Sequence, residues 1–264
     1  MRIRLSLLVP LLVLAACSGS KSDDSGSTAT TAGEGEGEGE GEGEGEGEGE
    51  GEGEGEGPDY PTGDPVGCDM TGAAFAMDFT SARVIKPSAL GPLIADSIDD
   101  ALAIGISAQS DTSVDVFLAL VDGGQQDVCT PTAAPPTGTW NDPVFAVGPG
   151  DLSVEVDGSE VTLSSFQFTA AANDDCQSIR DGVFQADLDT RLLGPLFGDL
   201  AGTEDPQEIC DFLVTFGSTC EACDSDGAEF CLKLIVDQMD GPAFGSPLVE
   251  VSASDIDANP ECVE

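Results

Sequence analysis

Leu152-Ser153-Val154-Glu155-Val156, followed by Asp157-Gly158 and then by the apolar-rich residues 161–168, is the stretch that decides the fold. Apolar and polar residues alternate on both sides of Asp157-Gly158, which is the pattern of two half-buried β-strands. An Asp-Gly pair between such runs favours the type I′ turn of hairpins, because both central residues of that turn need a positive φ. The stretch therefore predicts a β-hairpin and an antiparallel sheet.

Further strand patterns lie on both sides of this hairpin, at residues 75–85, 114–121, 183–188, 230–236 and 247–251. Helical spacing of apolar residues predicts a short helix near residues 90–103. Asp205-Pro206-Gln207-Glu208 has the order of a helix start, with an acceptor cap, a Pro and an acidic residue, so it predicts a second helix. We expect a mainly β fold, an antiparallel β-sandwich or barrel-like domain with two or three short helices.

Residues 129–149 contain five prolines and the only tryptophan, Trp140. Proline lacks a backbone N–H donor and breaks regular elements, so the sequence predicts a long loop here.

The first part of the chain has a different composition. Residues 1–16 combine Arg2 and Arg4 with a short apolar run that starts at Leu5. This run is shorter than the roughly 20 residues that span a bilayer, and it is typical of a secretory signal peptide. Residues 34–57 are Glu-Gly repeated twelve times and offer nothing to bury. We expect residues 17–57 to be a disordered spacer and residues 58–264 to be a single cysteine-rich β domain.

Leu14-Ala15-Ala16-Cys17, at the end of the apolar run, resembles the lipobox of bacterial lipoproteins. The resemblance implies cleavage before Cys17, a diacylglycerol thioether on its sulfur and a further fatty acyl chain, such as palmitate, on the new amino terminus. Several acyl chains hold a protein firmly on a membrane, whereas one chain binds only marginally. In this family an Asp after the cysteine favours retention at the inner membrane, so Ser18 implies an outer-membrane lipoprotein.

The charge of the chain excludes some partners and kinds of catalysis. The whole chain carries −43, and from Pro58 onward 37 acidic and five basic residues leave −32. Such a surface repels phosphate backbones, so we expect no nucleic-acid partner. The chain has no histidine, which removes Ser-His-Asp and Cys-His catalysis and every His-ligated metal site.

Eight cysteines follow Cys17, and an even number in an exported domain predicts four disulfides. They are Cys68, Cys129, Cys176, Cys210, Cys220, Cys223, Cys231 and Cys262. The four between Cys210 and Cys231 are close in sequence, and we favour the pairs Cys210–Cys220 and Cys223–Cys231. The pairs Cys210–Cys223 and Cys220–Cys231 remain an alternative, as do a four-thiolate zinc site and a redox-active Cys220-x-x-Cys223.

Two acidic segments have the residue types of a weak calcium site. Asp255, Asp257 and Asn259 match the first three oxygen positions of a calcium loop, but Pro260 stands where that loop needs Gly. Asp224, Asp226 and Glu229 form another fragment of that kind. We expect no cofactor other than structural calcium at these residues. Arg191, beside Asp189 and near Asp187, is expected to form a structural ion pair or cap.

Asp189-Thr190-Arg191, Cys210, Gly217, Cys220-x-x-Cys223 and Cys231-Leu232 together resemble uncharacterised cysteine-rich lipoproteins of myxobacteria-like lineages. The resemblance implies a cell-envelope location and no particular chemistry. We therefore expect a lipid-anchored outer-membrane protein, most simply a non-enzymatic surface binding or structural module held out on an acidic stalk. The alternative is a carboxylate-based extracellular hydrolase of the glycosidase type, which would need two facing acids. The sequence identifies no protein or small-molecule partner.

Overall fold

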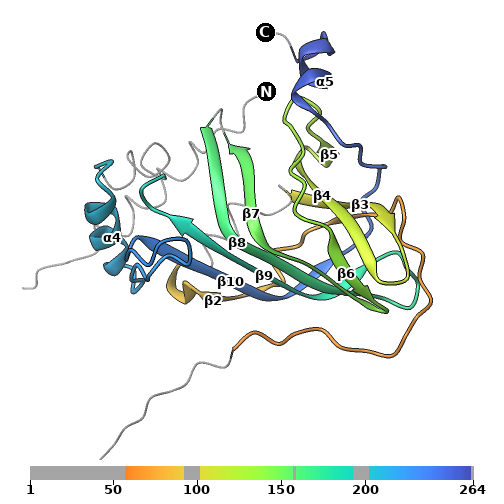
Figure 1. The fold of residues 1–264 in the computed structure, drawn as a ribbon, viewed down its shortest axis with the longest axis horizontal. Coiled ribbons are helices and arrows are strands. Elements are labelled where there is room, and N and C mark those ends of the chain that lie inside the picture. The colour runs from red at the N-terminus through yellow and green to blue at the C-terminus, as the bar shows by residue number, and fades with distance from the viewer. Residues whose placement is uncertain (1–56, 92–101, 157–158, 193–201, 263–264) are drawn as a thin grey trace, which may run out of the picture. The chain divides into compact units, whose positions relative to one another are not determined.

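The computed structural model describes residues 57–91, 102–156, 159–192 and 202–262, and contacts gather Gly57–Glu264 into one compact unit. The described residues form ten strands and two α-helices (Figure 1). The bounds are β1 Ala74–Ala76, β2 Arg83–Lys86, β3 Leu102–Gln109, β4 Ser113–Asp122, β5 Gln125–Gln126, β6 Gly138–Asn141, β7 Val144–Val156, β8 Ser159–Ala172, β9 Ile179–Asp189, α4 Pro206–Val214, β10 Cys231–Gly241 and α5 Ala253–Ala258, with the short 3-10 helix η2 at Ser88–Leu90. The prediction of a mainly β, antiparallel fold is confirmed. Neither helix is long and apolar enough to cross a bilayer.

The strands form one antiparallel sheet in the order β1-β3-β4-β6-β7-β8-β9-β10-β2, with β5 paired to β4. The predicted hairpin is its centre, because β7 and β8 pair over almost their whole length, with Val147 opposite Phe168 and Leu152 opposite Leu163. Asp157 and Gly158, the predicted turn, lie outside the described residues. The chain thus places sequential neighbours side by side from β6 to β10, which is the simplest antiparallel connection.

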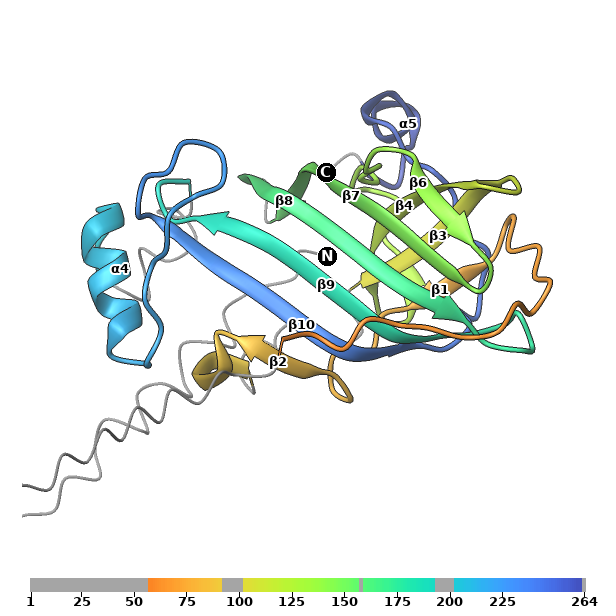
Figure 2. The ribbon, with the colours of Figure 1, turned by 60° about the horizontal axis from the view of Figure 1, so that its bottom comes forward.

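The sheet curls over one apolar core and is sandwich-like. A single cluster of buried side chains joins Ile104 and Val116 from β3 and β4 to Phe145, Phe168 and Val236 from β7, β8 and β10. In Figures 1 and 2 the strands β3, β4 and β6 accordingly lie at one end of the long strands β7–β10. Edge-on aromatic contacts fill the centre, with ring centroids of Phe145 and Phe168 at 5.8 Å and of Phe166 and Phe184 at 5.5 Å.

The strand ladder stays open and does not close into a barrel. It begins at β1 and ends at β2. Isolated backbone bridges nevertheless join Phe75 to Ala243 and Asp78 to Asp240, so the segment around the end of β10 meets the β1 edge. The strand predicted for residues 75–85 is divided into β1 and β2, because Asp78 Oδ1 accepts hydrogen bonds from Thr80 and Ser81 and turns the chain.

The long loop predicted for residues 129–149 is wrong beyond Gly138, where β6 and the start of β7 form. Pro143 lies in the turn between these strands. Pro149 lies where the β7–β8 register shifts, so its missing N–H interrupts no regular ladder bond. Gly148 beside it has φ +86° and lies against the carbonyl oxygen of Phe166, which leaves no space for a side chain.

The strand predicted for residues 247–251 is also wrong. The segment lies along β5, but side chains of other segments, and not the backbone of a neighbouring strand, form part of its backbone hydrogen bonds. Gln126 Nε2 donates to the carbonyl of Val249 at 2.6 Å and Gln126 Oε1 accepts from its N–H at 2.8 Å, while Thr132 Oγ1 accepts from the N–H of Val251. The helix predicted near residues 90–103 falls largely on residues 92–101, outside the described part; Leu102 already belongs to β3.

Residues 59–68, here called the strap, follow the Glu-Gly repeat and run along the long strands (orange in Figure 2). The strap is fixed at several points by side chains of the sheet. Asp237 of β10, a fully buried carboxylate, accepts from the N–H of Asp59 at 3.0 Å and from Arg83 Nε and Nη2 at 2.9 and 2.6 Å. Asp142 accepts from the N–H groups near the other end, and Cys68 forms a disulfide with Cys176.

Replacement of Asp237 by Asn tests the ionic part of this attachment. The hydrogen bonds from Arg83 hold the pKa of Asp237 below its ordinary value of 3.8. A lowered pKa adds stability that is present above the ordinary pKa and is lost as pH falls through the lowered one. We expect Asp237→Asn to cost about 1.5–3 kcal/mol in urea unfolding near neutral pH, where hydrogen bonds to charged groups have this value.

The cost of Asp237→Asn should shrink as unfolding is repeated at pH values progressively below the ordinary pKa of 3.8, because the unfolded state binds the proton first and the native state follows. Asp115→Asn, at an exposed position of β4, is the control and should change stability little at any pH. A cost of Asp237→Asn that is the same near neutral pH and at the lowest pH would contradict the ionic role of Asp237.

Candidate functional site

The candidate site lies at residues 218–230, here called the cysteine loop, which connects α4 to β10. The helix forms where the sequence predicts it: the Asp205 side chain accepts from the N–H groups of Gln207 and Glu208, and Pro206 is its first residue. Its buried residues Ile209 and Leu213 pack against Leu232 of β10. This packing holds α4 at the end of β9 and β10 and fixes the two ends of the loop.

Two disulfides tie the loop to its surroundings, and they are the favoured pairs. Cys210 of α4 bonds Cys220, with Cα atoms 5.6 Å apart, and Cys223 bonds Cys231, with Cα atoms 5.0 Å apart. The alternative of Cys210–Cys223 with Cys220–Cys231 is therefore wrong. The remaining cysteines form Cys68–Cys176 and Cys129–Cys262. All four sulfurs of the proposed zinc or redox centre are consumed in disulfides, so they offer no thiolates.

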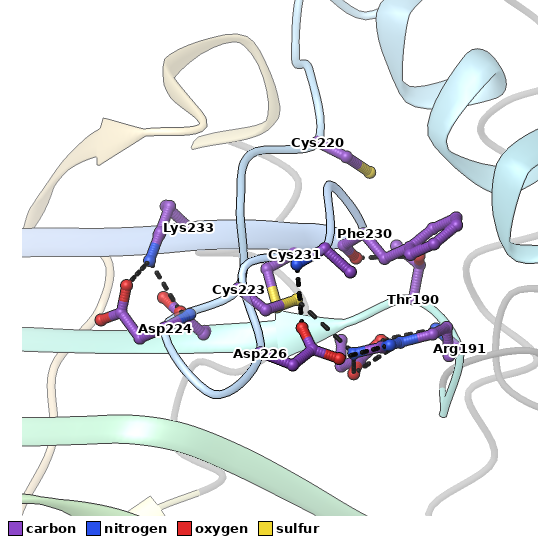
Figure 3. The surroundings of a disulfide bond; sticks show 12 residues. Thr190, Arg191, Cys220, Cys223, Asp224, Asp226, Phe230, Cys231 and Lys233 are labelled. Atoms are coloured by element: carbon purple, nitrogen blue, oxygen red, sulfur yellow. Dashed lines mark hydrogen bonds and ion pairs between the residues drawn. A yellow bond between two sulfur atoms is a disulfide. The ribbon is translucent and has the colours of Figure 1, made fainter.

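Lys233 of β10 connects the sheet to the cysteine loop (Figure 3). Its Nζ lies 2.7 Å from Asp187 Oδ2 and 2.8 Å from Asp224 Oδ1. Asp187 is buried in β9, whereas Asp224 is an exposed residue of the loop. Burial opposes the charge of Lys233, but the hydrogen bonds to both acids raise its pKa, and the same bond to Lys233 lowers the pKa of Asp224. The three charges form a link between a strand and the loop.

Arg191 makes a second link of the same kind. Its guanidinium contacts Asp189 at 2.6 Å and Asp226 of the loop at 2.8 Å, and it lies 5.4 Å from the ring centroid of Phe230. Hydrogen bonds from Arg191 hold the pKa of Asp189 and of Asp226 below their ordinary range and raise the pKa of Arg191 itself. The predicted structural ion pair of Arg191 with Asp189 is confirmed. Asp187, its other expected neighbour, binds Lys233 instead.

Four of the six calcium candidates already have partners of their own, and the other two are exposed. Asp224 binds Lys233 and Asp226 binds Arg191, while Glu229 is exposed on the same loop. The second segment forms part of α5: Asp255 and Ser252 make a reciprocal capping box at its start, Asp257 is exposed, and Asn259 accepts from the N–H of Glu261. Asp255 therefore serves to cap the start of α5, and the capping-box pattern Ser252-x-x-Asp255 signals this start in the sequence.

In the described part of the chain, three potential ligand atoms of His, Cys, Asp or Glu come within 4.8 Å of one another only at Asp189, Cys223 and Cys231. Two of these are the sulfurs of one disulfide. The grouping therefore reflects the packing of Asp189 beside that disulfide, and its sulfurs are not available as thiolate ligands.

Lys233, its pairing with Asp187, and the Arg83–Asp237 pair were not singled out from the sequence. The scarcity of Lys and Arg could have identified them, because each cation in so acidic a domain is expected to have an acidic partner. Each of the five Lys and Arg residues from Pro58 onward forms an ion pair: Arg83, Lys86, Arg180, Arg191 and Lys233. All five belong to β2, β9 or β10 or follow β9 directly. Lys86 of β2 bonds Glu221 at 2.7 Å, so it is a third cation that holds the cysteine loop.

Two hollows flank the cysteine loop. A groove of about 390 Å³ lies between the loop and α4, with the Cys210–Cys220 disulfide in its wall. In Figure 3 the side chain of Cys220 points toward α4, away from the Cys223–Cys231 bridge. A smaller hollow of about 90 Å³ lies on the outer face of β8–β10, between Gln167, Gln185 and Lys233.

Comparison with protein-family models, curated proteins and solved structures gives no match to this chain.

The engagement of the calcium candidates leads to a prediction for ion binding. The purified protein should melt at the same temperature with and without a chelator, because Asp224, Asp226 and Asp255 already have partners. Added calcium should raise the melting temperature no more than equal magnesium, since both screen the negative charge. A rise specific to calcium, and lost in Asp257→Asn or Asp226→Asn, would contradict this expectation.

Proposed function

We propose that the protein is a lipid-anchored protein of the cell envelope whose folded domain is a non-enzymatic surface binding or structural module on an acidic stalk. The observation that carries the proposal is the use of the cysteines. The four disulfides pair eight of the nine cysteines and leave Cys17 over. Cys17 is also the residue that the lipobox resemblance marks for acylation, and disulfides of this number suit an oxidising compartment outside the cytoplasm.

The direction of the pKa shifts of the carboxyl groups supports a binding or structural role over glycoside hydrolysis. A glycosidase general acid needs a raised pKa, so that it keeps its proton near neutral pH. Each clearly shifted carboxyl group in the described residues has a lowered pKa: Asp69, Asp78, Asp189, Asp224, Asp226, Asp237 and Asp255. The acids nearest to the cysteine loop are held as anions by Lys233 and Arg191, which suits structural links.

The Glu-Gly repeat gives the proposed stalk. Its 24 residues reach about 80 Å when fully extended, at roughly 3.3–3.6 Å per residue. Glutamates two positions apart repel one another within the Debye length of about 8 Å, so the stalk favours extension. Ser18 after Cys17 supports sorting to the outer membrane. The net charge of the domain favours cationic partners and disfavours nucleic acid.

Cys17→Ala tests the anchor. It removes the sulfur that would form the thioether, so we expect no incorporation of a labelled fatty acid and no partitioning of the protein with membranes or detergent. Metabolic acyl labelling and detergent phase separation measure this. Ser18→Ala, which leaves Leu14 to Cys17 unchanged, should be acylated like the wild type. A Cys17→Ala protein that is processed and still partitions with membranes would contradict the lipid anchor.

The proposal that the folded domain is not an enzyme is tested separately. The purified chain should show no turnover of a panel of aryl glycosides. Turnover that is abolished by replacement of a single Asp or Glu would replace the binding module with a hydrolase.

A further inference from the structure

We propose that the groove between α4 and the cysteine loop binds an arginine side chain of a partner protein. Its two walls have the same make-up. The last turn of α4 contributes Asp211 and Val214, and the end of the cysteine loop contributes Glu229 and Phe230. Each wall thus offers one carboxylate and one apolar side chain. Val214 is 53% exposed, so its side chain is open to contact.

Asp211 occupies an unfavourable place for an anion. The C-terminal end of a helix carries a partial negative charge, which favours Lys, Arg or His in the last turn. The last turn of α4 has no basic residue, and Asp211 lies in it. The hydrogen bond that Asp211 accepts comes from the neutral amide of Gln207, at 3.2 Å. A cation bound in the groove would relieve this repulsion, so the groove favours a positively charged ligand.

The domain's own cations do not supply that charge. The ion pairs of the described residues join Arg83, Lys86, Arg180, Arg191 and Lys233 to other acids, and neither Asp211 nor Glu229 takes part in them. The net charge of −32 from Pro58 onward adds a field that draws cations toward the surface. An anionic ligand would meet repulsion from both walls and from the domain as a whole.

An arginine side chain fits the two walls better than a small cation. Its aliphatic stem can lie against Val214 and Phe230 while the guanidinium, with five N–H donors, bridges two carboxylates. The cysteine loop already holds one arginine in this way: Arg191 bridges Asp189 and Asp226 and lies over the ring of Phe230. The groove volume of about 390 Å³ exceeds a single side chain, so it also admits neighbouring backbone of a partner.

This inference rests on the proposed role as a binding module, and its test does not involve the lipid anchor. A soluble form from Ser18 to Glu264, which lacks only the signal peptide and the proposed lipidated Cys17, is labelled with ¹⁵N and, with its disulfides intact, titrated with N-acetyl-Gly-Arg-Gly-amide at physiological salt. We expect saturable amide shifts centred on Asp211, Val214, Glu229 and Phe230. The matched peptide with citrulline, which has the same shape and no charge, should give no saturable shift. The lysine peptide should bind more weakly, because a compact, strongly hydrated ammonium lacks the planar fork of N–H donors with which a guanidinium pairs with carboxylates.

The double variant Asp211→Asn, Glu229→Gln should weaken binding of the arginine peptide by at least about tenfold, since two charge-assisted contacts are lost. The control Asp115→Asn, Asp151→Asn removes two exposed acids from β4 and β7 and should leave the affinity unchanged. Asp211→Asn alone should raise the melting temperature, because it removes an anion from a helix C-terminus, so weaker binding cannot be attributed to unfolding.

Three results would overturn the inference: shifts spread evenly over the acidic surface, equal weakening by both double variants, or equal binding of the citrulline peptide. Failure of this titration leaves acyl labelling of Cys17 unaffected, so a wrong groove and a wrong anchor give different results.

Discussion

The main electrostatic constraint on this domain is the repulsion among its 37 acids, which only five cations offset. No Lys or Arg occurs between Lys86 and Arg180, so β3 to β8 contribute none. The cations gather on β2, β9 and β10 and at the end of β9, where the strap and the cysteine loop lie against the sheet. Three of them, Lys86, Arg191 and Lys233, bind acids of the cysteine loop, and Arg83 binds the carboxylate that also holds the strap.

Four disulfides add covalent cross-links to the few ion pairs that five cations can form. Cys68–Cys176 and Cys129–Cys262 join residues 108 and 133 positions apart and fix both ends of the domain to the sheet. Cross-links over loops of this length remove about 4–5 kcal/mol of loop-closure entropy each from the unfolded chain, in the simplest description. The cysteine loop has two short cross-links and three ion pairs. The groove beside α4 lies next to these cross-links and is lined by Asp211 and Glu229, which take part in none of the ion pairs of the described residues.

The sequence alone predicts those structural features whose physical cause lies within a few neighbouring residues. Asp157-Gly158 predicts the β7–β8 hairpin, Asp205-Pro206 predicts the start of α4, and proximity in sequence favours Cys210–Cys220 and Cys223–Cys231. It does not predict features that depend on residues far apart in the chain. The partners of Cys68 and Cys129, the pairing of Lys233 with Asp187, and the use of Gln126 in place of a strand partner for Val249 depend on tertiary contacts. Asp255 was assigned to a calcium loop together with Asp257 and Asn259, because an acidic residue can equally serve in a helix cap, as Asp255 does with Ser252.

The dependence of stability on salt tests most directly whether repulsion among the acids is the dominant electrostatic constraint. Unfolding of the oxidised protein by urea can be followed from about 0.05 to about 0.5 M sodium chloride, over which the screening length falls to a few ångströms. If unpaired carboxylates dominate, the free energy of unfolding rises steadily with salt, and much less so near pH 3, where many of them are protonated. A free energy of unfolding that falls as salt is added would mean that the five ion pairs outweigh the repulsion, and would contradict this view of the domain.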